Sequence, residues 1–205
     1  WKDGYGDFTY GVSGNFTRNW NVVSKYNGST LTQWFTLASG SKALEVTGRI
    51  DWHEKHQILK LFFPCDLHAN EATYEIQFGH VTRPTHKNTS WEEAKFEVCG
   101  QKWVDISEYG YGFALLNDCK YGYSCDENVV GLTILKCATD PDPEADKCIH
   151  NFTYSIYTHE NTPCNGKTVQ MAYCLNQKMT AIDKISSSGT LPAEFSLVSV
   201  NKENI

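Results

Sequence analysis

Apolar and polar residues alternate along short stretches of this chain, and each stretch ends at residues that favour turns. Residues 72–78 alternate with a period of two throughout, and residues 43–52 place Leu44, Val46 and Ile50 on one face. A period of two is typical of β-strands, because successive side chains point to opposite faces of a sheet. The same signals predict strands at residues 31–37, 58–63, 96–98, 103–106, 113–116, 129–135, 152–157, 169–175 and 195–200.

Helical periodicity is weak throughout the chain. No segment carries an apolar stripe of helical spacing over three turns. Residues 90–94 could form a single helical turn with Ser90 as its N-cap. Residues 1–28 are rich in Gly, Asn and Tyr, and we interpret them as irregular hairpins. Ten or more short strands with few helices predict an all-β protein with the architecture of a β-sandwich.

The composition excludes several classes of protein. Charged residues make up 20% of the 205 residues and hydrophobic residues 40%, which excludes a disordered chain or a coiled coil. The net charge of −6 offers no basic face for phosphate, so we expect no nucleic-acid partner. No apolar run approaches the roughly 18 residues of a membrane helix, so we expect no membrane span. The chain begins at Trp1 without Met or an apolar leader, which indicates a processed product or a piece of a longer protein.

Eight cysteines are many for a cytosolic protein of this size, and no two of them form a Cys-x-x-Cys motif. The local spacing favours the disulfides Cys119–Cys125, Cys137–Cys148 and Cys164–Cys174, which would leave Cys65 for Cys99. Eight cysteines can pair in on the order of 100 ways, and eight reduced thiols are a further alternative. The connectivity therefore stays open.

Four glycosylation sequons accompany the cysteines, at Asn15, Asn27, Asn88 and Asn151. Disulfides and N-linked glycans both belong to oxidising compartments. We therefore expect a protein that is secreted and extracellular, or one that resides in the lysosomal or vacuolar lumen.

His53 and His56 flank Glu54 and Lys55 in a motif that looks at first like a zinc-protease signature. That signature needs two histidines four residues apart on a helix. Here the spacing is three and the context is strand-like, so we interpret both as structural histidines beside a turn. No phosphate loop or Gly-x-Ser-x-Gly motif is present either. We expect no metal site in this chain.

Two clusters of polar residues are better candidates for a binding site. His80, Arg83 and His86 lie where a strand passes into a loop, and they could bind a carboxylate or a sugar. The same residues could instead form a polar network that holds the loop against the sheet. Residue types alone do not separate these two interpretations.

The second cluster follows the apolar strand at residues 113–116. Asn117, Asp118 and Lys120 offer an amide, a carboxylate and an ammonium group, and Tyr121 offers an aromatic face. These groups match the hydrogen-bonding needs of sugar hydroxyls, and the end of a rigid strand positions them well. The alternative is a charged surface turn, in which an Asp118–Lys120 pair contributes little.

Several segments resemble one family, and they occur in that family's order. The longest are Ala72-Thr-Tyr-Glu-Ile-Gln-Phe-Gly-His80 and Arg83-Pro-Thr-His-Lys-Asn-Thr-Ser-Trp91, and the others span residues 51–56, 96–98, 114–122, 141–146 and 152–154. They resemble the C-terminal region of the glycoside hydrolase family 38 α-mannosidases, most closely the cytosolic/vacuolar type. Residues 1–30 match poorly. We therefore divide the chain into residues 1–30, an irregular extension or diverged strands, and residues 31–205, the β-sandwich domain.

The resemblance implies a galactose-mutarotase-like β-supersandwich that packs against a catalytic α/β barrel and a helical bundle. In the family those other parts carry the aspartate nucleophile and the zinc ligands, so the resemblance implies no catalytic residue and no zinc in this chain. It also places Asn117, Asp118, Lys120 and Tyr121 on a loop that approaches the active-site cleft. Only Cys119 lies within a motif of the cytosolic branch. Asn88 belongs to a family motif as well, so Asn15, Asn27 and Asn151 are better glycan candidates.

Two functions from different classes follow. In the first, the chain is the non-catalytic β-domain of a lumenal or secreted α-mannosidase, where it walls the substrate cleft and stabilises the catalytic domain. One face should then carry a large apolar patch. In the second, it is a stand-alone secreted glycoprotein, lectin-like or structural, that binds mannose-containing glycans or assembles as a homo-oligomer.

Overall fold

The computed structural model describes residues 7–11, 17–160, 166–182, 190, 192 and 194–201. The strands in this part of the chain are β1 (Asp7–Gly11), β2 (Thr17–Tyr26), β3 (Ser29–Ala38), β4 (Ala43–Asp51), β5 (Ile58–Pro64), β6 (Glu71–Ile76), β7 (Gly79–Pro84), β8 (Val98–Cys99), β9 (Trp103–Glu108), β10 (Tyr111–Asn117), β11 (Gly122–Asp126), β12 (Val129–Lys136) and β13 (Ile149–His159). The helices are α1 (Ser90–Glu93) and α2 (Gly166–Asn176).

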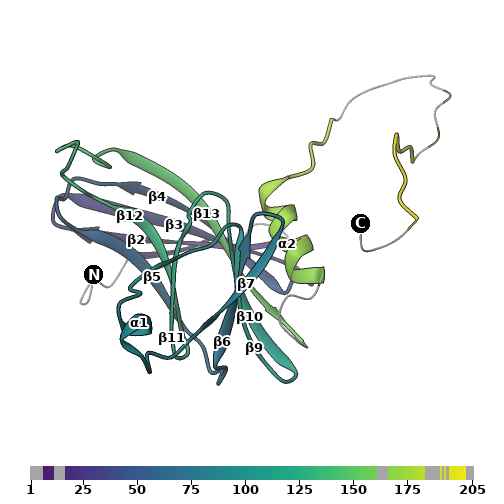
Figure 1. The fold of residues 1–205 in the computed structure, drawn as a ribbon. Coiled ribbons are helices and arrows are strands. Elements are labelled where there is room, and N and C mark those ends of the chain that lie inside the picture. The colour runs from purple at the N-terminus through teal and green to yellow at the C-terminus, as the bar shows by residue number, and fades with distance from the viewer. Residues whose placement is uncertain are drawn as a thin grey trace.

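The strands form two antiparallel sheets that pack face to face. The larger sheet has the order β1-β2-β3-β4-β13-β10-β9-β6-β7, and the smaller one has the order β5-β12-β11-β8. Figure 1 shows the smaller sheet lying against the larger one, with α2 on the outside of β9 and β10. The prediction of an all-β sandwich is confirmed.

The main core lies between the two sheets. Val104, Ile106, Phe113 and Leu115 of the larger sheet pack there with Leu132 of the smaller one. The residues that alternate with them face the other way. Trp103, Ala114, Leu116 and Tyr157 form a second cluster with Ala172 and Leu175 of α2. The central strands β9 and β10 are thus buried on both faces, which holds the residues at their ends in place.

Helix α2 is a correction to the sequence analysis, which predicted a strand at residues 169–175. Its buried positions are Thr168, Ala172 and Leu175, and this spacing places them on one face of a helix. Two of the three side chains are small, so the apolar stripe is short and weak. The β-branched residue Val169 favoured a strand locally, but packing against β9 and β10 decides the outcome.

The shorter predictions had mixed outcomes. The helical turn at residues 90–94 is present as α1, but its N-cap is Thr89, which forms a capping box with Glu92. Residues 195–200 do not form a strand, because they pair with no other strand in the described part and Leu197 is 90% exposed. Near the N-terminus, β1 pairs with β2, and β2 pairs with β3 in continuous register.

The disulfides predicted from spacing are not formed. The seven described cysteines are all free thiols, and Cys164 lies outside the described residues. Cys119 and Cys125, which were predicted to pair, contact the backbone carbonyls of Asn151 and Glu127 respectively. Burial, the main cause, raises the pKa of the Cys119 thiol to about 11 and that of Cys125 to about 12.

The sequons remain untested predictions. Asn27, Asn88 and Asn151 are exposed, and Asn15 lies outside the described residues. Neither helix of the described part is long and apolar enough to cross a membrane.

Candidate functional site

The loop formed by residues 117–121 connects the two sheets, because it leaves β10 in the larger sheet and enters β11 in the smaller one. Its first residue, Asn117, is almost completely buried. The side-chain oxygen accepts hydrogen bonds from the backbone N–H groups of Cys119, at 3.0 Å, and Lys120, at 2.6 Å. Its amide nitrogen donates to the carbonyl of Gln101, at 3.0 Å, and to the Tyr123 hydroxyl.

Asn117 is therefore a structural anchor and does not face solvent. Helix α2 strengthens the anchor, since the Asn176 amide donates to the Asn117 carbonyl at 3.0 Å. The side chain makes hydrogen bonds as both donor and acceptor, so an alanine would leave buried polar groups unpaired. The sequence predicts Asn117 as a carbohydrate-facing residue; in the structure it fixes the loop and lies at the hollow beside it.

Replacing Asn117 with alanine should lower the free energy of unfolding by about 2 kcal/mol, because buried N–H and C=O groups lose their partners. Urea denaturation followed by circular dichroism measures the change. The matched control is Asn70→Ala at an exposed position, which should change stability by about 0.5 kcal/mol or less. Equal effects of the two substitutions would contradict the anchoring role.

The residues after Asn117 are the ones that reach solvent. Asp118 is exposed, and one of its carboxylate oxygens accepts a hydrogen bond from the Thr153 backbone N–H at 2.9 Å. Tyr121 is 57% exposed. The Lys120 ammonium lies 5.9 Å from the centre of the Phe152 ring. The loop thus presents a carboxylate and a phenol ring on a backbone that is held at several points.

Two adjoining hollows lie beside this loop and share the residues Gln77, Gln101 and Lys102, so we describe them together as the loop groove. The hollow at the loop has a volume of about 490 Å³ and is lined by Asp118 and Tyr121. The other has a volume of about 420 Å³ and extends to the β6–β7 hairpin and α2. Its further lining residues include Phe78, His80 and Tyr173.

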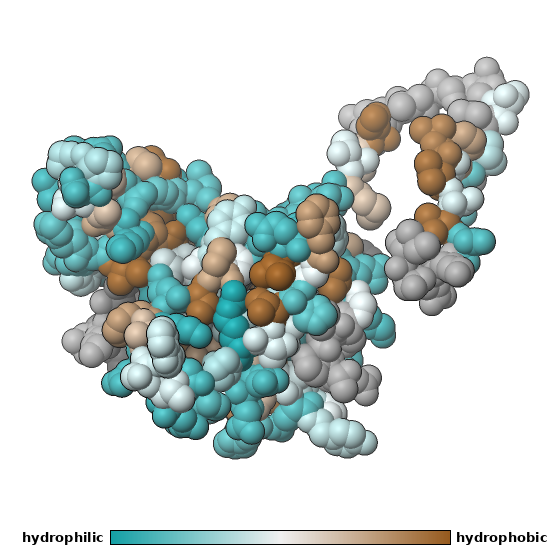
Figure 2. All heavy atoms as spheres, viewed as in Figure 1, coloured by the Kyte–Doolittle hydropathy of each residue, from teal (hydrophilic) through white to brown (hydrophobic). Residues whose placement is uncertain are grey.

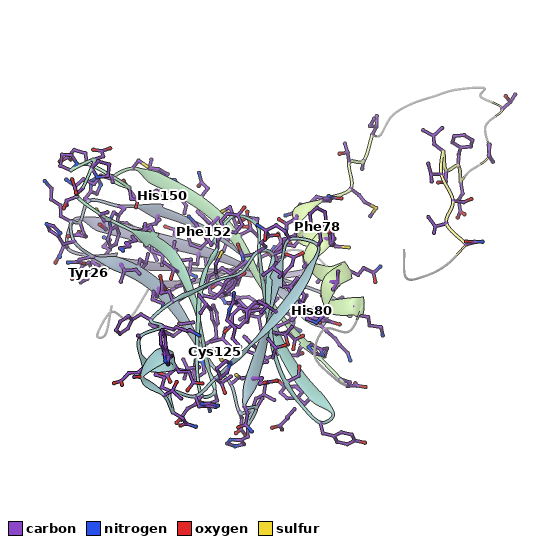
Figure 3. The ribbon with its side chains drawn as sticks, in the orientation of Figure 1. Tyr26, Phe78, His80, Cys125, His150 and Phe152 are labelled. Atoms are coloured by element: carbon purple, nitrogen blue, oxygen red, sulfur yellow. The ribbon has the colours of Figure 1, made fainter. Side chains whose placement is uncertain are left out.

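The loop groove combines aromatic faces with hydrogen-bonding groups. The Lys102 ammonium lies 3.3 Å from the Glu75 carboxylate and 4.9 Å from the centre of the Tyr173 ring. Phe78 sits at the tip of the hairpin and is fully exposed. Figure 3 shows Phe78 and His80 beside α2. Amides, a carboxylate, an ammonium group and aromatic rings are the groups that a carbohydrate site uses.

The cluster of His80, Arg83 and His86 is divided in the structure. His80 lines the loop groove, whereas Arg83 and His86 line a separate cavity next to α1. The cause is the geometry of β7, where positions 80 and 83 differ by an odd number and point to opposite faces. Lys120 was also predicted to face a carbohydrate, but it does not line the groove.

Several groove residues could not be found from the sequence. Gln77 follows β6, Gln101 and Lys102 come directly before β9, and Tyr173 lies on a helix that was predicted as a strand. Pairing of β6 with β9 and of β9 with β10 brings these segments together. Among the described residues, no group of three or more His, Cys, Asp or Glu side chains is arranged to hold a metal ion.

Comparison with known families settles the relationship of the chain. The family described as Glycosyl hydrolases family 38 C-terminal domain matches residues 9–144. The chain belongs to glycosyl hydrolase family 38. The match starts within β1 and includes β2 and β3.

The relatives in this family are long enzymes. Human alpha-mannosidase 2C1 is 42% identical over 80% of this chain and 16% of its own length. Alpha-mannosidase G of Dictyostelium discoideum is 41% identical over 87% of this chain and 16% of its own length. The alpha-mannosidase of Saccharomyces cerevisiae is 43% identical over 63% of this chain. This chain therefore spans about 16% of the length of the first two relatives.

These relatives correct the prediction of location. They are of the cytosolic or vacuolar type, and the described cysteines are free. The prediction of a secreted, extracellular protein is therefore wrong, while a vacuolar location is compatible with the relatives. The error arose because cysteine number and sequons were interpreted as signs of an oxidising compartment.

A solved structure confirms the fold. An alpha-mannosidase from Enterococcus faecalis superposes with a TM-score of 0.74 over 84% of this chain and 24% of its own, at 16% identity. A second family 38 protein from the same organism gives 0.72. The β-supersandwich that the family resemblance implied is thus present.

Proposed function

We propose that the chain is the non-catalytic C-terminal β-domain of an α-mannosidase, whose catalytic domain supplies the nucleophile and the zinc. Membership of family 38 and the roughly sixfold greater length of the relatives support this proposal. The domain stabilises the catalytic part and walls its substrate cleft.

We further propose that the loop of residues 117–121 faces the mannoside. The observation that carries this proposal is that Asn117 fixes the loop while Asp118 and Tyr121 stay exposed beside the loop groove. A rigid backbone that presents a carboxylate and a ring can bind sugar hydroxyls and a sugar face with little loss of conformational entropy.

The experiment uses the whole enzyme that contains this chain. Asp118→Asn and Tyr121→Ala should each raise KM for a mannose oligosaccharide by about three- to tenfold, because each removes one contact to the substrate. Circular dichroism and thermal unfolding should stay unchanged, since both side chains are exposed. Steady-state kinetics with an oligosaccharide and with an aryl mannoside measures the effect.

The matched control is Tyr109→Ala. Tyr109 is fully exposed at the β9–β10 turn, at the opposite end of β10 from the loop. Its replacement should leave KM unchanged. Wild-type KM in both loop variants would refute the assignment of the loop to substrate, while leaving the role as a supporting domain intact.

The distribution of apolar residues bears on the alternative function, a stand-alone sugar-binding or structural protein. Figure 2 shows several separate groups of apolar side chains among hydrophilic ones. The face in this view therefore does not carry the single large apolar patch that was predicted for a docked domain. Native mass spectrometry separates the two functions. Co-purification with a catalytic part supports the role as a domain of an enzyme. A lone chain that binds mannosides would support the stand-alone protein instead.

A further inference from the structure

A further cavity in the described part lies away from the loop groove and shares no lining residue with it. Its volume is about 660 Å³, which is within the range of small-molecule sites. It lies between β5, β7, β11 and the segment that contains α1, and we call it the α1 cavity. Figure 3 marks Cys125, one of its lining residues, on the α1 side of the fold, apart from Phe78 and His80.

Most charges in the α1 cavity are already paired. Lys60 lies 2.8 Å from Glu97, and Lys87 lies 2.6 Å from Asp126. His86 lies 3.5 Å from Glu92. The lining contains four Lys or Arg residues and four Asp or Glu residues. A ligand with a high charge of either sign would therefore meet as many repulsive groups as attractive ones.

Arg83, Lys95 and Glu127 line the cavity and take part in none of the ion pairs of the described residues. One terminal nitrogen of Arg83 is buried without a hydrogen-bond partner. The guanidinium stacks on the Tyr74 ring, 4.7 Å from its centre, so its orientation is fixed. A buried donor without a partner destabilises the fold. Arg83 also lines the cavity, so its guanidinium offers hydrogen-bond donors to a ligand there.

The walls of the cavity include two exposed aromatic rings. Phe62 of β5 is 60% exposed and Phe96, which follows α1, is 81% exposed. Exposed phenyl rings beside a fixed guanidinium suit a ligand that has an apolar body and one anionic group. A carboxylate matches the fork of arginine donors and carries a single charge, whereas a phosphate dianion would bring two charges into a lining whose acidic and basic residues are equal in number.

We propose that the α1 cavity binds a small molecule with one carboxylate on an apolar ring, in which Arg83 binds the carboxylate and Phe62 and Phe96 contact the ring. This site is independent of the loop groove and of the proposed mannosidase function. His86 and Lys60 shape the cavity through their ion pairs with Glu92 and Glu97.

Isothermal titration calorimetry of the whole protein with benzoate tests the proposal at low ionic strength. Benzoate should bind at one saturable site, and the neutral analogue benzamide should bind at least about tenfold more weakly, because it cannot form the charged hydrogen bonds. Inorganic phosphate should also bind at least about tenfold more weakly than benzoate. Equal binding of benzamide or phosphate would overturn the proposal, and so would the absence of any benzoate binding.

Two substitutions locate the site. Arg83→Gln should weaken benzoate binding by about tenfold or more. Phe96 is exposed, so Phe96→Ala should leave the fold intact. This substitution should weaken benzoate binding by about threefold. The control is Arg49→Gln, an exposed arginine on β4 outside the cavity, which should leave the affinity unchanged. Wild-type affinity in both cavity variants would overturn the assignment.

Discussion

Replacing Asp105 with alanine should lower the free energy of unfolding by about 3–5 kcal/mol, the expected effect of breaking a buried charged network. The Asp105 carboxylate on β9 is buried and accepts a hydrogen bond from the Ser107 hydroxyl on the same strand. It also contacts His159 Nε2 on β13 at 2.8 Å and accepts from the Thr168 hydroxyl on α2 at 3.2 Å. One carboxylate thus joins two strands and a helix, and its removal leaves their polar groups without this acceptor.

Chemical denaturation of the wild type and of Asp105→Ala measures this loss. The matched control is Lys178→Gln, which removes an exposed ion pair with Glu45 and should change stability by about 0.5 kcal/mol or less. A loss of similar size in both variants would show that the buried network contributes no more than a surface pair.

The same network makes a prediction about pH. Burial alone would lower the pKa of His159, but the hydrogen bond and charge of Asp105 outweigh it, and the net pKa is raised. A raised folded-state pKa gives stability that is complete below the unfolded value of about 6.5 and is lost as pH rises through the folded value. The stability difference between the wild type and Asp105→Asn should therefore shrink as the pH rises from about 6.5. A difference that stays constant over this range would contradict the charge on His159.

Alternation of side chains predicted most strands but not their relations in space. Strand β6 was predicted from its regular alternation, although both of its faces are buried at residues 72–75. Helix α2 was predicted as a strand, since a buried face made partly of Thr168 and Ala172 leaves little apolar signal. The disulfides were wrong because closeness in sequence does not place two thiols in contact.

The candidate site was predicted in part for the same reason. The loop of residues 117–121 was found because it follows an apolar strand, yet the burial of Asn117 and its hydrogen bonds to the loop backbone could not be read from residue type. His80 and Arg83 were grouped although the period of a strand already separates them. Lys102 and Tyr173 join the groove only through sheet pairing and helix packing, which no local pattern encodes.

Replacing Gly48 with alanine should lower the free energy of unfolding by about 3 kcal/mol, at the upper end of the usual range for overpacking. Gly48 on β4 lies directly opposite Phe152 on β13, and the Phe152 ring covers the glycine. A Cβ at position 48 would overlap several ring atoms. The ring is buried in the core between the sheets, so it has little room to move.

A double-mutant cycle with Phe152→Ala separates this contact from other effects of Gly48. Phe152→Ala alone should lower stability by about 3–5 kcal/mol. In that background Gly48→Ala should have no penalty and could stabilise by up to about 1 kcal/mol, because alanine loses less backbone entropy than glycine. The control is Gly79→Ala, where a Cβ would meet no neighbouring atom. An undiminished penalty in the double mutant would show that strain elsewhere on β4, and not the ring, requires the glycine. If the Phe152 ring does require the glycine, the contact between them also affects the loop of residues 117–121, because Lys120 lies over the same ring.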